Sequence, residues 1–147
     1  MKSFVLDQSD DLWDHFAKQI KRVSWKGGQF LAAQMLAHRF TDWERVIIMT
    51  DQGKLVGFCA VVKEDIVEGT GLSPFVGFVF VSEAYRGQHL SQKLVKMAEE
   101  QIVRIGFHEA YIVTPHVGLY EKIGYQQIDT ANDQFGRKMR ILEKNLE

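Results

Sequence analysis

Residues 75–100, FVGFVFVSEAYRGQHLSQKLVKMAEE, decide the fold of this chain. The first seven residues, Phe75 to Val81, are apolar on both alternating faces, which is typical of a strand in the centre of a sheet that is covered on both sides. The polar segment from Ser82 to Gln88 leads into a helix with apolar residues at every fourth position. These positions are Leu90, Leu94, Ala98 and Ile102. The stretch therefore predicts a central strand, a tight turn and an amphipathic helix.

The turn between this strand and this helix has the features of an anion-binding site. The first N–H groups of a helix have no partner within it, and they lie at the positive end of the helix dipole. Here they project from the carboxyl end of a strand, which is a common place for phosphate. Arg86 adds positive charge, and Gly87 lets the backbone turn closely. On these residues alone, an ordinary turn with a solvated arginine is the alternative interpretation.

The remaining segments predict an α/β sandwich with a mixed sheet. Strands are expected at residues 2–6, 45–49, 54–63, 110–113, 125–129 and 138–142, and helices at residues 10–22, 30–38 and 119–122. Ser9, Asp10 and Asp11 are candidate caps of the first helix, and Gly27-Gly28 is expected to break the chain after it. Gly106 suits the end of the helix that follows the turn. We expect one domain over residues 1–147.

Composition narrows the classes of function. Among 147 residues, 18 are Lys or Arg and 19 are Asp or Glu, and this balance argues against broad binding to nucleic acid or to an anionic membrane. Cys59 is the single cysteine, and this excludes an intrachain disulfide and a multi-thiolate metal site. It lies in an apolar run and is expected in the core. No apolar stretch approaches the ~20 residues of a membrane span, and the first residues lack an apolar signal core. A cytoplasmic protein is expected.

Two motifs in this sequence resemble those of the GNAT superfamily of N-acetyltransferases. The family signature after a strand is Arg/Gln-x-x-Gly-x-Gly/Ala. Arg86 fills its first position, whereas His89 stands where glycine is usual and Ser91 stands where Gly or Ala is usual. Residues 118–125, GLYEKIGY, are similar to the family's Leu-Tyr-Glu-Lys-x-Gly-Phe segment. The resemblance implies a GNAT-like sandwich, in which helices flank a central, mixed and mostly antiparallel sheet. It also implies acetyl-CoA as co-substrate. His15, His38 and His108 lack the spacing of metal ligands, so no metal is expected.

The resemblance assigns a set of cofactor-binding residues. The backbone of Val79, Phe80 and Val81 would hydrogen-bond the pantetheine arm, at a point where the central strand splays from its neighbour. Backbone amides would hold the pyrophosphate, and they belong to Arg86, Gly87, Gln88, His89, Leu90 and Ser91. An amide binds phosphate whatever its side chain, although a Cβ at His89 is expected to crowd the ligand.

The resemblance also nominates catalytic residues. Tyr120 matches the tyrosine that protonates the departing thiolate in many relatives, and a phenol of pKa ~10 is a fair acid for this step. The alternative is a tyrosine that only packs on a helix face. The central strand lacks the glutamate that relatives use as general base, so Glu83, just past the strand, and His116 are candidates. A water-mediated route is the leading hypothesis for the proton transfer.

The expected reaction is direct transfer of an acetyl group from acetyl-CoA to an amine of a small molecule, peptide or protein. The loop carboxylates Glu64, Asp65 and Glu68 are a second candidate feature, because they would attract a cationic acceptor. Three tryptophans lie in the N-terminal third, and each is expected to pack in the core, with a place in the acceptor site as the alternative. They are Trp13, Trp25 and Trp43. The alternative function is a non-catalytic acyl-CoA binding or sensing domain. Neither nucleic acid nor a membrane is an expected partner, and a homodimer is left open.

Overall fold

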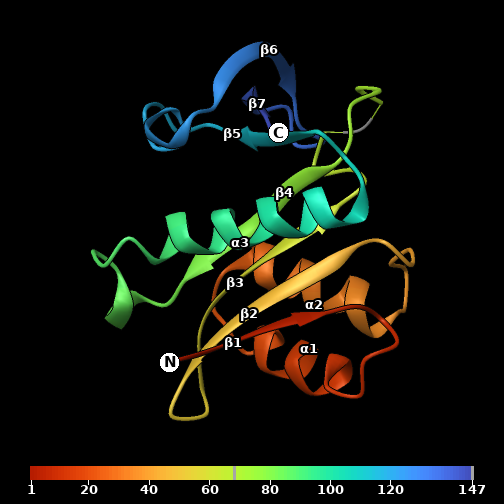
Figure 1. The fold of residues 1–147 in the computed structure, drawn as a ribbon, viewed down its shortest axis with the longest axis vertical. Helices are drawn as coiled ribbons and strands as arrows, with labels where there is room; N and C mark the ends of the chain where they lie inside the picture. Colours follow the sequence, from red (N-terminus) through yellow and green to blue (C-terminus); the bar gives the residue numbers. More distant parts are fainter. Residues whose placement is uncertain (68, 147) are drawn as a thin grey trace.

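The computed structural model describes residues 1–67 and 69–146, and it contains a seven-stranded sheet with helices on both faces (Figure 1). The strands are β1 (Lys2–Leu6), β2 (Arg45–Asp51), β3 (Lys54–Val62), β4 (Phe75–Val81), β5 (Glu109–Thr114), β6 (Gln126–Asn132) and β7 (Lys138–Asn145). The helices are α1 (Trp13–Lys21), α2 (Lys26–Leu36) and α3 (Leu90–Ile105), with short 3-10 turns η1 (Glu83–Tyr85) and η2 (Glu121–Ile123).

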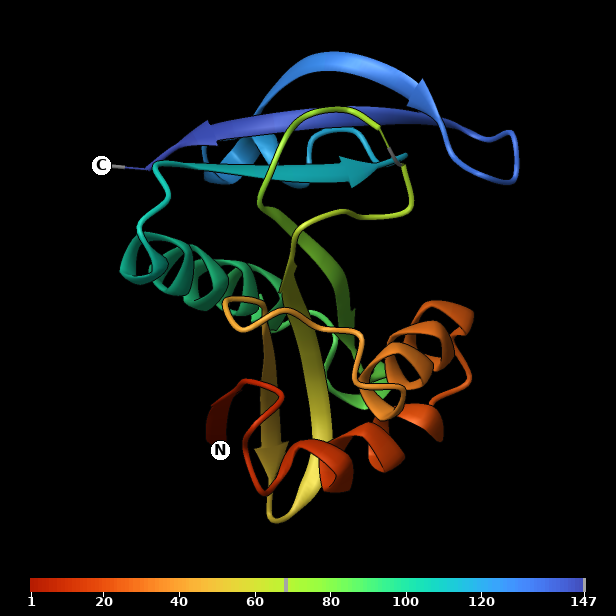
Figure 2. The same cartoon turned by 90° about the vertical axis from the view of Figure 1, so that its right-hand side faces the viewer.

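The strands follow the order β1-β2-β3-β4-β5-β7-β6 across the sheet. Every neighbouring pair is antiparallel except β4 and β5, which are parallel. Parallel neighbours need a crossover connection, and α3 supplies it. Figure 2 shows β5 and β7 crossing above the ends of β3 and β4, so the sheet turns at the β4–β5 step. The predicted sandwich, in which helices flank a central, mixed and mostly antiparallel sheet, is confirmed.

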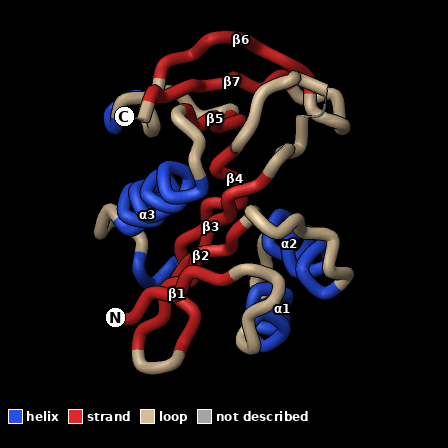
Figure 3. The backbone as a smooth tube through the Cα atoms, turned by 45° about the vertical axis from the view of Figure 1, so that its right-hand side comes forward, coloured by secondary structure: helices blue, strands red, loops and turns tan. Residues whose placement is uncertain are grey.

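Two apolar cores explain why β4 is hydrophobic on both faces. Helix α3 covers one face of the sheet, while α1 and α2 cover the other (Figure 3). Val76 packs with Leu94, Ala98 and other residues of the α3 core, and its neighbour Phe75 belongs to the core under α1 and α2. Successive side chains of a strand point to opposite faces, so a strand between two helical layers must be apolar throughout. Cys59 is fully buried in the α3 core.

Strand β4 is bent by a bulge halfway along. Phe80 pairs with Phe58 and Gly77 pairs with Ala60, so that two residues, Phe78 and Val79, stand opposite the single residue Cys59. Phe78 has φ 55°, which is a strained conformation for a bulky residue. A bulge re-aims the strand and increases its twist. Beyond this point β4 diverges from β5.

Three sequence expectations about the helices were wrong. Gly27 and Gly28 do not break the chain but lie inside the first turn of α2. They serve close packing, because a Cβ on Gly27 would lie 2.3 Å from the Trp25 ring and one on Gly28 would lie 2.5 Å from Val23 Cγ2. Helix α1 begins only at Trp13, without a side-chain cap. The helix expected at residues 119–122 is only the 3-10 turn η2, in which the N–H groups of Ile123 and Gly124 donate to the carbonyls three residues earlier.

Some strands extend beyond their expected limits, as in β7, which continues to Asn145. The predictions for β1 and β4 match the observed bounds. Across the two described ranges, no helix combines the length and the apolar character that crossing a membrane requires.

Candidate active site

A groove of about 1020 Å³ runs along the end of β4, between the α1–α2 connection and the first turn of α3. It contains residues from four segments that are far apart in the sequence. They are Gln19, Arg22, Val23, Ser24, Trp25, Leu55, Val79, Phe80, Val81, Ser82, Glu83, Tyr85, Arg86, Gly87, His89, Leu90, Ser91, His116 and Leu119. A volume of this size accommodates a ligand considerably larger than an amino acid.

The turn before α3 presents free backbone amides to this groove. Gly87 has φ 86° and His89 has φ 59°, so two left-handed residues lead the chain into the helix. Within the described chain, the N–H groups of Gly87, Gln88 and His89 donate to no backbone carbonyl, and no side chain caps the helix. A Cβ built on Gly87 would meet nothing within 4 Å. The turn is therefore an open cradle of donors at a helix N-terminus, which suits a phosphate group.

The left-handed conformation of His89 gives a physical reason for the glycine that is usual at this position. Glycine adopts positive φ without the steric penalty that a Cβ brings. Histidine is among the residues that tolerate this region better than most. The exposed side chain of His89 projects from the turn, and the backbone follows the path that the motif requires.

Two polar contacts hold the turn against the sheet. The Tyr85 hydroxyl donates to Asp51 Oδ2 at 2.9 Å, which joins η1 to the end of β2. Arg86 Nε donates to the Val81 carbonyl at 3.0 Å, so this guanidinium is held beside the end of β4. The sequence led us to expect Arg86 only as a charge at the phosphate site, whereas the structure shows that it also braces the turn.

The end of β4 offers its edge to the groove. The β4–β5 ladder includes Phe75 and Tyr111 but has no further registered pair among the described residues. On the other edge, Phe80 and Val81 pair with β3. The residues from Phe78 to Val81 are partly exposed, in contrast to the buried first half of the strand. An extended ligand could add to this free edge as a strand does.

The structure brings most of the predicted site residues together. Of the expected cofactor-binding residues, those of β4 and those of the turn all line the groove except Gln88, whose exposed side chain lies outside it. Glu83 and His116 line the groove as well. Tyr120 does not line it and lies next to Leu119, which does.

Tyr120 is buried, with 9% of its surface exposed, and its ring packs edge-on against Tyr125 at 6.2 Å between centroids. Its hydroxyl makes no hydrogen bond to a described residue, whereas the Tyr125 hydroxyl donates to Glu99 Oε2 at 2.8 Å. Burial raises the pKa of Tyr120 to about 12, and the negative charge of Asp65 acts in the same direction. The phenol therefore remains protonated through the neutral range and has a proton to donate.

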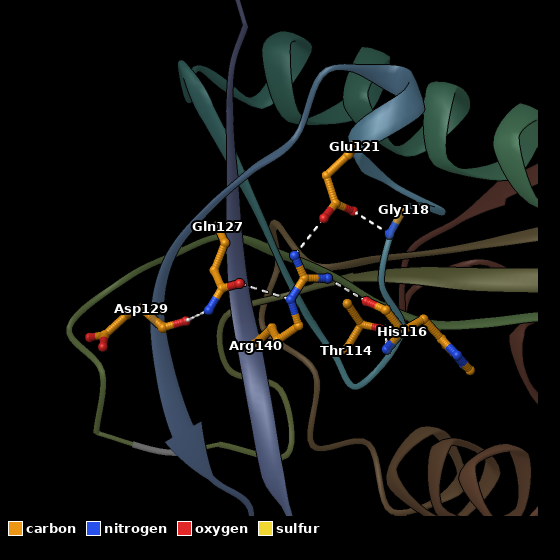
Figure 4. A network of polar contacts seen from close by, with 7 residues as sticks. All are labelled: Thr114, His116, Gly118, Glu121, Gln127, Asp129 and Arg140. Carbon is orange, nitrogen blue, oxygen red and sulfur yellow. Dashed lines mark hydrogen bonds and ion pairs between the residues drawn. The ribbon is translucent and has the colours of Figure 1, made fainter.

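A network centred on Arg140 holds the loop that carries His116 and Tyr120 (Figure 4). The Arg140 guanidinium donates to the His116 carbonyl, to Glu121 Oε2 and, at 2.8 Å, to Gln127 Oε1. Glu121 in turn accepts the Gly118 N–H at 3.0 Å, and this bond with the Arg140 bond lowers the pKa of the Glu121 carboxyl. Sequence reasoning missed Arg140, because nothing local marks a residue of β7 that contacts a loop more than twenty positions earlier.

The three tryptophans have different environments. Trp13 is buried and its Nε1 donates to the Met35 carbonyl at 2.9 Å, while Trp43 packs on Phe107. Only Trp25 lines the groove, where it is 38% exposed and stacks on Phe80 at 5.7 Å. The core was therefore the correct expectation for Trp13 and Trp43. Trp25 is the tryptophan that faces the groove.

The acidic loop after β3 lies at a second cavity and not at the groove. Glu64 and Asp65 line this cavity of about 190 Å³, and Glu68 lies outside the described residues. Within residues 1–67 and 69–146, no three His, Cys, Asp or Glu side chains are arranged to hold a metal ion.

Known proteins with this arrangement are acetyltransferases. Residues 42–127 match the model of the acetyltransferase (GNAT) domain family. The chain is 32% identical to the uncharacterized N-acetyltransferase YjgM of Escherichia coli K12, over 46% of this chain and 48% of that protein. It is 36% identical to the acetyltransferase Atu2258 of Agrobacterium fabrum, over 48% of this chain and 54% of that protein. The chain thus spans about half the length of these curated relatives.

Solved structures agree over nearly the whole fold. An aminoglycoside 6'-N-acetyltransferase in complex with coenzyme A superposes on 99% of this chain and 97% of its own, with a TM-score of 0.73 and 16% identity. The aminoglycoside 6'-N-acetyltransferase from Enterococcus faecium gives a TM-score of 0.71 at 16% identity and the same coverage. Likeness at this identity establishes the fold. Because the family model covers more than half of the sequence, the chain belongs to the GNAT acetyltransferase family.

Proposed function

We propose that this chain transfers an acetyl group from acetyl-CoA directly to an amine of a small molecule or a peptide. The observation that carries the proposal is the continuity of the groove, which joins the free amides of the turn before α3 to the free edge of β4. A phosphate site and a strand-like docking edge in one groove match the pyrophosphate and the pantetheine arm of coenzyme A. The named activity of relatives as N-acetyltransferases supports an amine as the acceptor.

The residues of the groove fit acetyl-CoA in shape and in donor chemistry. The amides from Gly87 to Ser91 would bind the pyrophosphate, and the dipole of α3 would favour its negative charge. The backbone of Val79, Phe80 and Val81 would pair with the amides of the pantetheine arm. The open space beside Gly87 leaves room for the diphosphate, and no side chain caps the helix at this end. Acetyl-CoA supplies the activated thioester carbonyl.

Tyr120 is the proposed proton donor to the departing sulfur. Its hydroxyl has no partner among the described residues, and its raised pKa keeps it protonated. Glu83 and His116 remain candidates for a base, since both line the groove, but neither is buried or held in a defined hydrogen bond through its side chain. Transfer of the amine proton through water remains the leading hypothesis for a base in the groove. A cytoplasmic location and a single domain over residues 1–147 also stay predictions.

One experiment separates catalysis from cofactor binding alone. Acetyl-CoA binding is measured by calorimetry with and without a chelator, and release of free coenzyme A is then measured with a panel of amines and peptides. Binding that survives the chelator, together with amine-dependent release, supports the proposal. Binding without release for any amine would instead identify a non-catalytic acyl-CoA domain. Absence of binding at millimolar acetyl-CoA would overturn both functions.

A further inference from the structure

The second cavity lies beside the bulge of β4, on the side of α2, and adjoins the groove at consecutive residues. Phe78 lines the cavity, and the next residue, Val79, lines the groove. The two spaces therefore border the same bulge of β4. A volume of about 190 Å³ is too small for a whole drug-sized ligand, but it admits the short arm of one.

The Asp65 carboxyl lies against β4 at Gly77, next to this bulge. The loop after β3 folds back over β4, and a Cβ on Gly77 would lie only 2.7 Å from Asp65 Oδ2. Only glycine at this strand position leaves room for the carboxyl. Oδ1 accepts the N–H of Ile66 at 2.7 Å. In the described ranges, no lysine, arginine or histidine forms an ion pair with Asp65.

The charges around Asp65 favour a cation in the cavity. Glu64 and Glu44 also line it, and Arg39 is the basic residue among the lining residues. Glu44 is occupied by its own loop, since it accepts the Thr41 N–H and the Lys63 N–H at 2.8 Å each. Burial raises the pKa of the Asp65 carboxyl to about 6, only partly offset by the Ile66 N–H. At pH 7 to 8 this carboxyl is ionised in a poorly solvated place, where a bound cation would stabilise it.

The apolar wall of the cavity suits a cation on an organic arm. The rings of Phe30 and Phe78 stack at 6.1 Å with 17° between their planes, and Phe30 is 47% exposed although it is a large apolar residue. An aromatic face attracts an ammonium group by the cation–π interaction. The cavity thus combines a partly buried carboxylate with aromatic surface, as expected for a primary amine on an apolar arm.

We propose that this cavity binds the acceptor as a primary ammonium with an apolar arm, and that Asp65 takes the proton that frees the nitrogen for attack. This inference rests on the proposed acetyl transfer. The ammonium gives one proton to Asp65, and the nitrogen lone pair forms the C–N bond with the thioester carbonyl carbon. The C–S bond breaks with its electron pair on sulfur, sulfur takes a proton from Tyr120, and the second proton that leaves the nitrogen restores the Tyr120 hydroxyl. Asp65 passes its proton to solvent. One proton is released to solvent overall.

The place of Asp65 in the cavity favours this assignment over Glu83 and His116, which line the groove and not the cavity. The negative charge of Asp65 also contributes to the raised pKa of Tyr120. A proton acceptor and a proton donor on either side of the diverging strands would flank an acetyl group docked at Val79. Glu64, Glu44 and Arg39 are the other charged groups that face Asp65 in the cavity.

The test uses phenethylamine, a primary amine with an aromatic arm, and phenylacetate as its anionic counterpart. Asp65→Asn removes the charge but keeps an oxygen for the Ile66 N–H. Asp42→Asn removes an exposed carboxylate outside the cavity and is the matched control. We expect calorimetry on coenzyme A-saturated protein to show binding of phenethylamine and not of phenylacetate. A hydrogen bond to a charged group is worth ~1.5–3 kcal/mol, so Asp65→Asn should weaken binding about tenfold or more.

Turnover with phenethylamine provides the second measurement. Asp65→Asn should lower it by ~10²-fold or more and remove the fall in rate below pH 6, while acetyl-CoA affinity stays within about twofold. Gly77→Ala, whose Cβ displaces the Asp65 carboxyl, should have the same effect. Wild-type binding of both probes or of neither would overturn the inference, as would an Asp65→Asn protein equal to Asp42→Asn. Failure of wild-type acetyl-CoA binding would instead overturn the proposed function, and the two probes would then be titrated into the protein without coenzyme A to test the cavity by itself.

Discussion

Phe75 on β4 pairs with Tyr111 on β5, and the parallel ladder between these strands continues to no other registered pair in the described chain. The pair joins the two halves of the sheet at one end of β4. Past it, the bulge at Phe78 turns β4 away, and the backbone of Val79 to Val81 is left without a partner on the β5 side. The groove and the second cavity both border this bulge, so one backbone irregularity shapes both proposed substrate sites.

Gly87→Val should weaken acetyl-CoA binding about tenfold or more, and Arg86→Lys should weaken it less. Side-chain space does not decide the difference, because nothing lies within 4 Å of a Cβ at Gly87. The backbone conformation of Gly87 decides it, because a β-branched residue adopts a φ of 86° only with strain of about 1–3 kcal/mol. Lysine keeps the charge at Arg86 and loses the planar fork. Calorimetric titration checks both variants after thermal melts show that they fold. Normal affinity in folded Gly87→Val would contradict the proposed cradle.

His89→Gly should keep acetyl-CoA affinity and change the free energy of unfolding only slightly. Glycine removes the penalty of φ 59°, about 1 kcal/mol, but it also increases the entropy of the unfolded chain by a similar amount. The expected net change lies between zero and about 1 kcal/mol of stabilisation. Urea unfolding and calorimetry measure the two quantities. A clear loss of binding would show that the imidazole itself contacts the cofactor.

Tyr120→Phe should lower turnover by ~10²- to 10⁴-fold while acetyl-CoA affinity is nearly unchanged. The substitution keeps the buried ring and removes a hydroxyl that no described residue binds, so its loss should affect the transition state and not the ground state. Steady-state kinetics with any accepted amine and calorimetry with acetyl-CoA provide the measurements.

Tyr125→Phe is the matched control for Tyr120→Phe. It removes the hydroxyl that donates to Glu99, and this loss of a buried bond should destabilise the fold by about 1–3 kcal/mol. Turnover per folded molecule should change little. Unchanged turnover in Tyr120→Phe would exclude Tyr120 from the mechanism, and a parallel loss of affinity would make it a binding residue.

Arg140→Gln should lower kcat more than it weakens acetyl-CoA binding. The guanidinium fixes the carbonyl of His116 and the carboxylate of Glu121, so its removal loosens the loop that carries Tyr120 (Figure 4). Small misplacement of a catalytic group is enough to cost ~10²-fold in rate. Arg137→Gln is the control, because it breaks an ion pair with Asp133 in the β6–β7 turn, away from this loop. Equal kinetics for the two variants would contradict a positioning role for Arg140.

Asp65→Asn should become more stable relative to the wild type as the pH rises from 5 to 8. The folded-state pKa of about 6 lies above the ordinary value of 3.8, so folding favours the protonated carboxyl. The protonated Asp65 carboxyl adds to the free energy of unfolding of the wild type. This contribution is complete below pH 3.8 and is lost as the pH rises through 6. Each unit of pKa shift corresponds to about 1.4 kcal/mol, which bounds the effect at roughly 3 kcal/mol. Urea unfolding at both pH values tests this, and a constant difference between the proteins would refute burial of the charge.

Sequence periodicity determined the local elements around the site. The continuous apolar run Phe75–Val81 predicted β4 within its observed bounds, and the four-residue spacing from Leu90 predicted α3 with Gly106 at its left-handed end. The turn motif located the free amides of the cradle correctly, because helix N-termini carry them whatever the tertiary context. These features depend on residues that are close in sequence, so the chain itself encodes them.

Tertiary structure alone decided the rest. Gly27 and Gly28 suggested a break, yet the rings and methyl groups packed against them hold them in α2. In the sequence, Asp65 is one of three similar loop carboxylates, and only the fold brings it against Gly77. The sequence around Arg140 likewise does not mark it, and only the position of β7 lets it bond to the loop at His116. Burial, ion pairing and pKa depend on which distant segments meet, and this long-range packing has no local pattern in the sequence.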